Sequence, residues 1–175
     1  MIFQSNRLQF RSVEETDLPF FLALMTNPLV MERISSGKPR TPQEIEFVLQ
    51  KSLRLLDEDP HFGHWVVSES STGIPVGIFI LRKPATEEET EGLEIGYSFL
   101  PEFWNKGYAT ESAARVLEFV KEKYGDVRII ALIQPDHSAS RKVLLKLNFK
   151  TIGTTTYVSP ADGQKFLSEI LELTY

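Results

Sequence analysis

A glycine-bearing turn between Trp104 and Ala109 is the part of this sequence best suited to carry out chemistry. It reads WNKGYA, follows a strand that ends at Pro101, and leads directly into a long amphipathic helix. The first turn of a helix carries unpaired backbone N–H groups and the positive end of the helix dipole, which together bind phosphate. Gly107 and Ala109 are small enough to let a diphosphate approach the backbone closely. The turn therefore predicts a site for a phosphorylated cofactor.

Several groups in this turn would contribute to such a site. Backbone amides from Asn105 to Thr110, including that of Tyr108, would point into one concavity, and Lys106 would add a positive charge beside it. The alternative is a plain tight turn that opens a core helix, with Trp104 as ordinary packing. Because the turn lies between a strand and a long helix, its context favours the phosphate role, with Trp104 as both packing and scaffold.

The composition limits the classes of function. A chain of 175 residues with 42% hydrophobic and 25% charged residues is typical of a single soluble domain, here 1–175. The net charge of −5 argues against nucleic acid as a partner. The absence of cysteine excludes disulfides, Cys-ligated zinc, iron–sulfur clusters and a Cys nucleophile. With neither a signal-peptide pattern nor an apolar run long enough to span a membrane, we expect a cytoplasmic protein without a membrane partner.

The periodicity of apolar residues predicts the elements that position the turn. Strands are expected over 7–13, 64–68, 76–81, 93–100, 127–133, 149–158 and 165–174. Helices are expected from Thr16 or Asp17 to the residue before Pro28, from the Thr41 capping box to near Pro60, over 107–124 and over 138–147. A mixed sheet with helices on both faces, in an α/β (α+β) fold, accommodates this order.

That order, together with three sequence blocks, resembles the GNAT superfamily of acyl-CoA N-acyltransferases. The blocks are RLQFR, EIGYSFLPEFWNKGYATE and SASRKVLLKLNF, and within the superfamily they are most similar to the RimJ/RimL branch of ribosomal-protein N-terminal acetyltransferases. The family writes its phosphate loop as [QR]-x-x-G-x-[GA], and Trp104 takes the first position here. The resemblance implies a mostly antiparallel sheet of about seven strands, flanked by about four helices and splayed between its fourth and fifth strands.

The resemblance also implies acetyl-CoA as the cosubstrate. In the family the pantetheine arm pairs with the free backbone edge of the splayed strand, so groups around Phe99 and Leu100 would hold the arm and the thioester oxygen. The alternative for these two residues is an ordinary strand end near a proline.

The third block implies two further contacts. Family members often have Asn at the position of His137, so this histidine would contact the cofactor or, equally, remain a solvated loop residue. Ser140 matches a small polar position that lies near the sulfur in some relatives, where it would protonate the leaving thiolate, although a serine in a first helical turn is more often a cap. The tyrosine acid of many other family members falls at Leu144 and is missing.

Acyl transfer to an amine needs a neutral nucleophile, an oxyanion donor and a path for protons. Since no cysteine exists to form an acyl-enzyme, direct attack in a ternary complex is the simplest mechanism. Glu94 is the best candidate for the general base, because it lies on the strand that would support the thioester and matches the family's carboxylate there. The alternative is an inert, solvent-facing Glu at a strand start. Tyr157 and Ser159 are weaker candidates in the last hairpin, where some RimJ/RimL relatives carry a carboxylate.

Two readings of the function follow. The first is an acetyl-CoA-dependent N-acetyltransferase, a monomer or homodimer, whose acceptor is a primary amine on a protein N-terminus or a small molecule. The second is an acyl-CoA-binding module that has lost turnover. The acidic run from Glu87 to Glu91 would attract a cationic amine, although such runs are more often solvated loops. His61 and His64 are too few for a metal site, so we expect no metal and a structural role for both.

Overall fold

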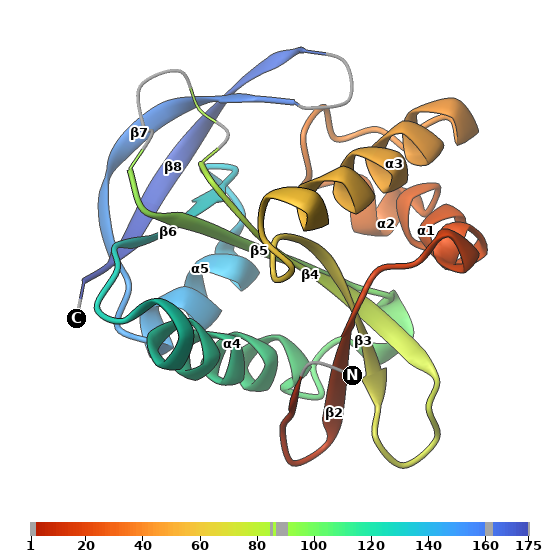
Figure 1. The fold of residues 1–175 in the computed structure, drawn as a ribbon. Helices are drawn as coiled ribbons and strands as arrows, with labels where there is room; N and C mark the ends of the chain where they lie inside the picture. The colour runs from red at the N-terminus through yellow and green to blue at the C-terminus, as the bar shows by residue number, and fades with distance from the viewer. Residues whose placement is uncertain (1–2, 85, 87–90, 160–162, 175) are drawn as a thin grey trace.

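One continuous eight-stranded sheet runs through the protein, seen in a computed structural model that describes residues 3–84, 86, 91–159 and 163–174 (Figure 1). The strands lie in the order β1-β2-β3-β4-β5-β6-β8-β7, and all neighbours are antiparallel except β5 and β6. They are β1 (Phe3–Gln4), β2 (Leu8–Ser12), β3 (Gly63–Glu69), β4 (Pro75–Arg82), β5 (Leu93–Phe99), β6 (Ile129–Ile133), β7 (Lys150–Val158) and β8 (Lys165–Leu173). All seven predicted strands are present, and the two-residue β1 is an addition that the sequence pattern is too short to reveal.

Within the described residues, five α-helices pack against this sheet. They are α1 (Leu18–Met25), α2 (Pro28–Met31), α3 (Pro42–Glu58), α4 (Tyr108–Tyr124) and α5 (Ser138–Lys146), with 3-10 turns η1 (Glu15–Asp17) and η2 (Pro101–Phe103). The one-turn α2 was not predicted: Pro28, expected only to end α1, also begins the next helix. Proline is tolerated there because the first helical N–H needs no partner, and the Asn27 side chain accepts a hydrogen bond from the Leu29 N–H.

Local sequence signals set several helix ends. The predicted capping box of α3 is confirmed: the Thr41 hydroxyl accepts from the Glu44 N–H, and the Glu44 carboxylate accepts from the Thr41 N–H at 2.7 Å. Asn148 has the left-handed φ of +67° that was predicted after α5. None of the helices in the described parts of the chain has the length and apolar character needed to cross a membrane.

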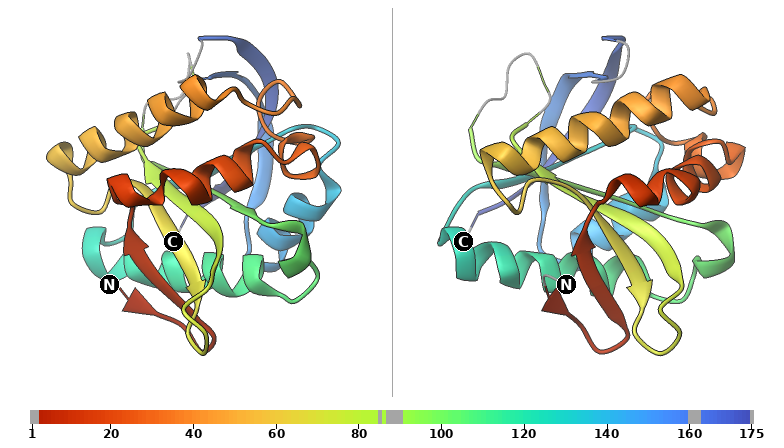
Figure 2. Two further views of the ribbon diagram at one scale, coloured as in Figure 1. Left: turned by 90° about the vertical axis from the view of Figure 1, so that its right-hand side faces the viewer. Right: turned by 45° about the vertical axis from the view of Figure 1, so that its right-hand side comes forward.

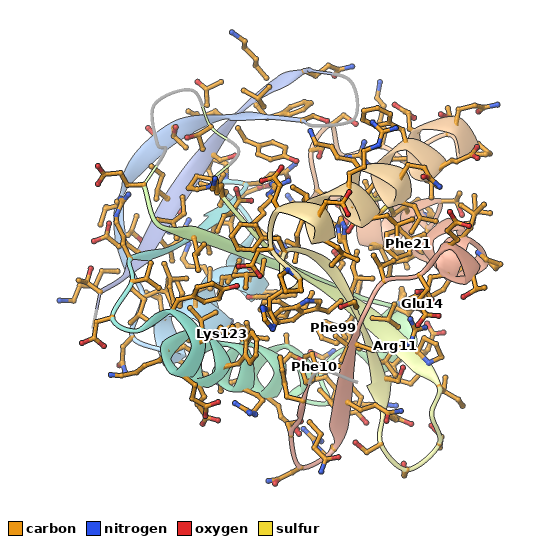
Figure 3. All side chains as sticks on the ribbon, viewed as in Figure 1. Phe10, Arg11, Glu14, Phe21, Phe99 and Lys123 are labelled. Atoms are coloured by element: carbon orange, nitrogen blue, oxygen red, sulfur yellow. The ribbon has the colours of Figure 1, made fainter. Side chains whose placement is uncertain are left out.

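The sheet separates two hydrophobic layers. Phe10 and Phe99 belong to the layer between the sheet and α4, whereas Phe21 belongs to the layer under α1, α2 and α3 (Figure 3). Two further views show α4 and the α1–α3 group on opposite sides of the strands (Figure 2). Alternate residues of one strand therefore face different layers, and the two faces of β5 serve different surroundings.

The sheet opens at its single parallel pair. Only three residues of β5, Leu93–Ile95, pair with β6, after which β6 continues along β8 while β5 continues to Phe99 beside β4 alone. The Leu100 N–H donates to the Val76 carbonyl on the β4 side. Because antiparallel hydrogen bonding alternates, the backbone groups of Tyr97 and Phe99 point the other way, into the opening. This is the predicted splay, between the fourth and fifth strands counted from β2.

Candidate active site

The predicted phosphate turn lies at one end of the splay and leads into α4. Asn105 has a φ of +60° and Gly107 a φ of +80°, so the chain takes two left-handed steps directly before the helix. Gly107 is the N-cap, and the first turn of α4 contains Tyr108, Ala109 and Thr110. This curvature brings the unpaired amides at the start of a 17-residue helix to an exposed turn, as anion binding requires.

An ion pair that was not predicted fixes this turn. The Arg7 guanidinium donates to the Lys106 carbonyl at 3.0 Å and to the Glu111 carboxylate at 2.7 Å, and the Ser5 hydroxyl also donates to Glu111. Burial alone would raise the pKa of Glu111, but the hydrogen bonds from Ser5 and Arg7 outweigh it and lower that pKa. The two charges sit in blocks that carry the family resemblance, yet they are 104 positions apart, so sequence spacing gives no sign of the pair.

Trp104 connects the turn to the splayed strand. Its indole N–H donates to the Phe99 carbonyl at 2.7 Å, while the residue as a whole is 43% exposed. That bond occupies the Phe99 carbonyl, and the Leu100 N–H is bonded to β4. Among the described residues, the backbone groups left at the free edge are therefore the Phe99 N–H and both groups of Tyr97. A cofactor contact expected at Leu100 would therefore fall one to three residues back along β5, at Phe99 and Tyr97.

The first turn of α5 contacts this edge. Ser140 is buried, and its hydroxyl oxygen lies 3.0 Å from the hydroxyl oxygen of Tyr97. Burial raises the pKa of Tyr97 to about 12, and the Ser140 hydrogen bond only partly opposes that rise. Leu144, one turn later, is fully buried in the core.

His137 occupies the N-cap position of α5 and is partly buried. Burial and the positive charge of Arg33 lower its pKa, and Asp136 opposes them. Arg33 and Asp136 form an ion pair, and the Gln134 side chain donates to the Ser35 carbonyl at 3.1 Å. These contacts tie the loop after α2 to the connection between β6 and α5, so His137 lies where two segments meet.

Glu94 lies on the opposite face of β5 from Tyr97. It is only 4% exposed, so the solvent-facing alternative does not hold. The Arg82 guanidinium, across the strand pair on β4, donates to the Glu94 carboxylate at 2.6 Å and lies 5.9 Å from the centre of the Tyr157 ring. Burial lowers the pKa of Arg82, but Glu94 and Tyr157 outweigh it and raise that pKa. The structure thus joins two predicted residues, Glu94 and Tyr157, through an arginine that was not predicted.

A cavity of about 310 Å³ opens on the Glu94 face of the sheet, beneath α3. Its lining combines an apolar wall with a few charged groups: Val48, Lys51, Ser52, Leu55, Glu58, Phe62, His64, Ile80, Arg82, Lys83, Pro84 and Val158. The floor of the cavity adjoins β5, because Ile80 pairs with Gly96 and Arg82 pairs with Glu94. A volume of this size suits a small molecule or the end of a chain.

The histidines differ in their surroundings. His61 bonds to Asp59 at 3.0 Å, whereas His64 lines the cavity, and its Nδ1 is buried without a hydrogen-bond partner among the described residues. Burial and the charges of Arg82 and Arg40 lower the pKa of His64 to about 3, so the ring is neutral. No group of three candidate metal ligands occurs within the described ranges.

Two remaining predictions concern Ser159 and the acidic run from Glu87 to Glu91. Ser159 is buried with its hydroxyl unpartnered among the described residues, at the end of the hairpin. The acidic residues Glu87, Glu88 and Glu89 lie outside the described residues, whereas Glu91 is described and exposed.

Comparison with known proteins gives consistent matches. Residues 7–150 match a family model described as an acetyltransferase (GNAT) domain. The uncharacterized N-acetyltransferase YoaA of Bacillus subtilis (strain 168) is 25% identical over 98% of this chain and 96% of its own. The crystal structure of a GNAT-family acetyltransferase from Bacillus anthracis is 24% identical, covers 98% of this chain and 96% of its own, and superimposes with a TM-score of 0.77.

The structural matches include the RimJ/RimL branch without singling it out. RimL, a ribosomal L7/L12 α-N-protein acetyltransferase solved with coenzyme A, has a TM-score of 0.77 at 15% identity, covering 99% of this chain and 97% of its own. At that identity the likeness shows a shared fold.

Proposed function

Because this chain belongs to the GNAT acetyltransferase family and is an acyltransferase, we propose that it transfers an acetyl group from acetyl-CoA to a primary amine. The observation that carries the proposal is the splay: a free backbone edge on β5 that begins beside a helix N-terminus able to bind a diphosphate. Coenzyme A has both matching parts, a diphosphate and an amide-bearing pantetheine arm. The amides from Asn105 to Thr110 would bind the first, and the Tyr97 and Phe99 backbone groups the second.

The two faces of β5 carry different candidate groups for the reaction. Glu94, Arg82 and the cavity beneath α3 lie on one face, and Tyr97 and Ser140 lie on the other. We place the acceptor amine in the cavity and the thioester sulfur on the α5 side, so that the nucleophile and the leaving group occupy opposite faces of the strand. This arrangement suits direct attack in a ternary complex.

Proton transfer then has a defined direction. The amine nitrogen forms the C–N bond and releases a proton toward Glu94, directly or through water. The C–S bond breaks, its electron pair stays on sulfur, and Ser140 supplies a proton on that side. To accept this proton, the Glu94 carboxylate must give up part of its hydrogen bonding with Arg82. Tyr157, which lies beside Arg82, would then support the arginine. His64 is neutral at the cavity wall and adds no charge that would repel an ammonium group.

The acceptor is a primary amine on a protein N-terminus or a small molecule, and a thiol-release assay identifies it. Purified protein is incubated with acetyl-CoA and separate acceptors: N-terminal peptides, polyamines, aminoglycosides and amino acids. We expect free CoA to appear at a rate that saturates with one acceptor class. Coenzyme A binding by calorimetry without release across the whole panel would instead support the binding-module reading.

A further inference from the structure

Two hydroxyl groups, one buried and one partly buried, meet at the mouth of the splay. The side chain of Tyr97 comes from β5 and that of Ser140 from the first turn of α5, and their oxygens lie 3.0 Å apart. Ser140 is buried and Tyr97 is partly buried, and the Tyr97 ring packs against Phe79 with centroids 5.8 Å apart. A polar pair in such surroundings has few other partners, so its orientation is well defined.

Either oxygen of this pair can donate the hydrogen bond, and our inference takes the phenol as the donor. Because burial raises the pKa of Tyr97 to about 12, the phenol keeps the proton that this direction needs throughout the neutral range. It has two acceptors on Ser140, the hydroxyl oxygen at 3.0 Å and the backbone carbonyl at 3.4 Å, and the hydroxyl oxygen is the closer. A serine oxygen that accepts a hydrogen bond still has its own proton to give elsewhere.

The backbone of Tyr97 places this pair at the reacting centre of the proposed function. Its N–H and C=O face the splay, where they would hold the arm that ends in the thioester, while its side chain reaches α5. Ser140 therefore lies beside the free edge of β5, on the face opposite Glu94. A group on that face meets the leaving sulfur rather than the attacking amine.

We infer that Tyr97 is a positioning residue for the reaction: its hydroxyl orients Ser140 so that the serine proton points at the sulfur of the leaving thiolate. This inference rests on the proposed function. As the C–S bond breaks, the electron pair goes to sulfur, the Ser140 proton moves to sulfur, and the serine oxygen recovers a proton from Tyr97. Tyr97 then takes a proton from water, and Glu94 gives the proton that it accepted from the amine back to water, so the thiol and the amide form without a net change in protons.

The test compares Tyr97→Phe, Ser140→Ala and the double variant in steady-state CoA release. Phenylalanine keeps the ring that packs on Phe79 and removes only the hydroxyl. We expect kcat to fall about tenfold or more in each single variant, with unchanged KM for acetyl-CoA and for the amine. Because the two hydroxyls act as one unit, the double variant should lose no more than the worse single variant.

Tyr124→Phe is the matched control, since the Tyr124 hydroxyl donates to Asp59 at 2.9 Å in another part of the molecule. Its kcat should equal that of the wild type. Wild-type kcat in Tyr97→Phe, multiplicative losses in the double variant, or a matching loss of CoA affinity would each overturn the inference while the proposed function stands. If the wild type releases no CoA with any amine, the proposed function fails and the inference fails with it.

Discussion

Replacing Glu94 with Gln tests the arginine–carboxylate pair at the centre of the proposed acceptor site. The side chains of Arg82 and Glu94 are 13% and 6% exposed, and their atoms approach to 2.6 Å. Removing one partner of a buried ion pair costs about 3–5 kcal/mol, because the other charge stays buried without compensation. Glutamine keeps an oxygen that can accept from Arg82, so we expect a loss near the lower limit, about 3 kcal/mol.

Urea unfolding, followed by tyrosine and tryptophan fluorescence, measures this loss, and a thermal scan should show Tm falling by roughly 6–12 °C. A double-mutant cycle built from Arg82→Met and Glu94→Leu isolates the pair itself. The Arg82→Met, Glu94→Leu double variant removes both charges, so it should recover much of the stability lost in each single charge deletion.

A loss below about 0.5 kcal/mol in Glu94→Gln, or a cycle without coupling, would refute the buried pair. The same variant tests the proton acceptor: kcat should fall while the affinity for coenzyme A, measured calorimetrically, stays within twofold. Wild-type turnover in a folded Glu94→Gln protein would remove Glu94 from the mechanism.

Three other perturbations test the phosphate turn and the cavity. Gly107→Asp should weaken coenzyme A binding by at least tenfold in calorimetry, because it adds a negative charge at the helix N-terminus; Gly107→Asn, uncharged and tolerant of the φ of +80°, should bind clearly better. Arg7→Ala should weaken coenzyme A binding about tenfold by releasing the Lys106 carbonyl, whereas Arg115→Ala on α4 should not. Equal affinities in the two variants would contradict the role of Arg7 in fixing the turn. The pKa of His64 is lowered from 6.5 to about 3 in the folded protein. Between these two pH values the unfolded chain therefore binds a proton at His64 that the folded protein does not. Stability should therefore decline as pH drops below 6.5, by at most about 1.4 kcal/mol per pH unit, and His64→Leu should make urea midpoints less dependent on pH between 4 and 6.5.

The sequence allowed most of the sheet to be predicted, because its signals are local. Alternating apolar residues mark β5, the Thr41 capping box marks the start of α3, and Asn148 marks the end of α5. Each signal depends on neighbours a few positions away, which a single chain displays directly. The short β1 and α2 lack such a pattern, since two to four residues are too few to show a period.

The pairings that shape the site are long-range and escaped prediction. Arg82 follows an apolar strand and reads as its polar end, and only the register of β4 against β5 reveals that it faces Glu94. Tyr97 reads as one more buried residue on an alternating strand, because its contact with Ser140 depends on how α5 crosses the splay. Side-chain type marked Glu94 and Ser140 as candidates, whereas their partners required the tertiary structure.

The opening between β5 and β6 also bears on how a protein of this kind evolves. Recognition through main-chain groups at Tyr97 and Phe99 demands a particular strand conformation but places little demand on the side chains that the strand displays. Under the proposed function, the α3 face can then acquire new substitutions without disturbing how acetyl-CoA is held. Diversification of the acceptor can therefore proceed on one side of a strand while its opposite edge stays unchanged.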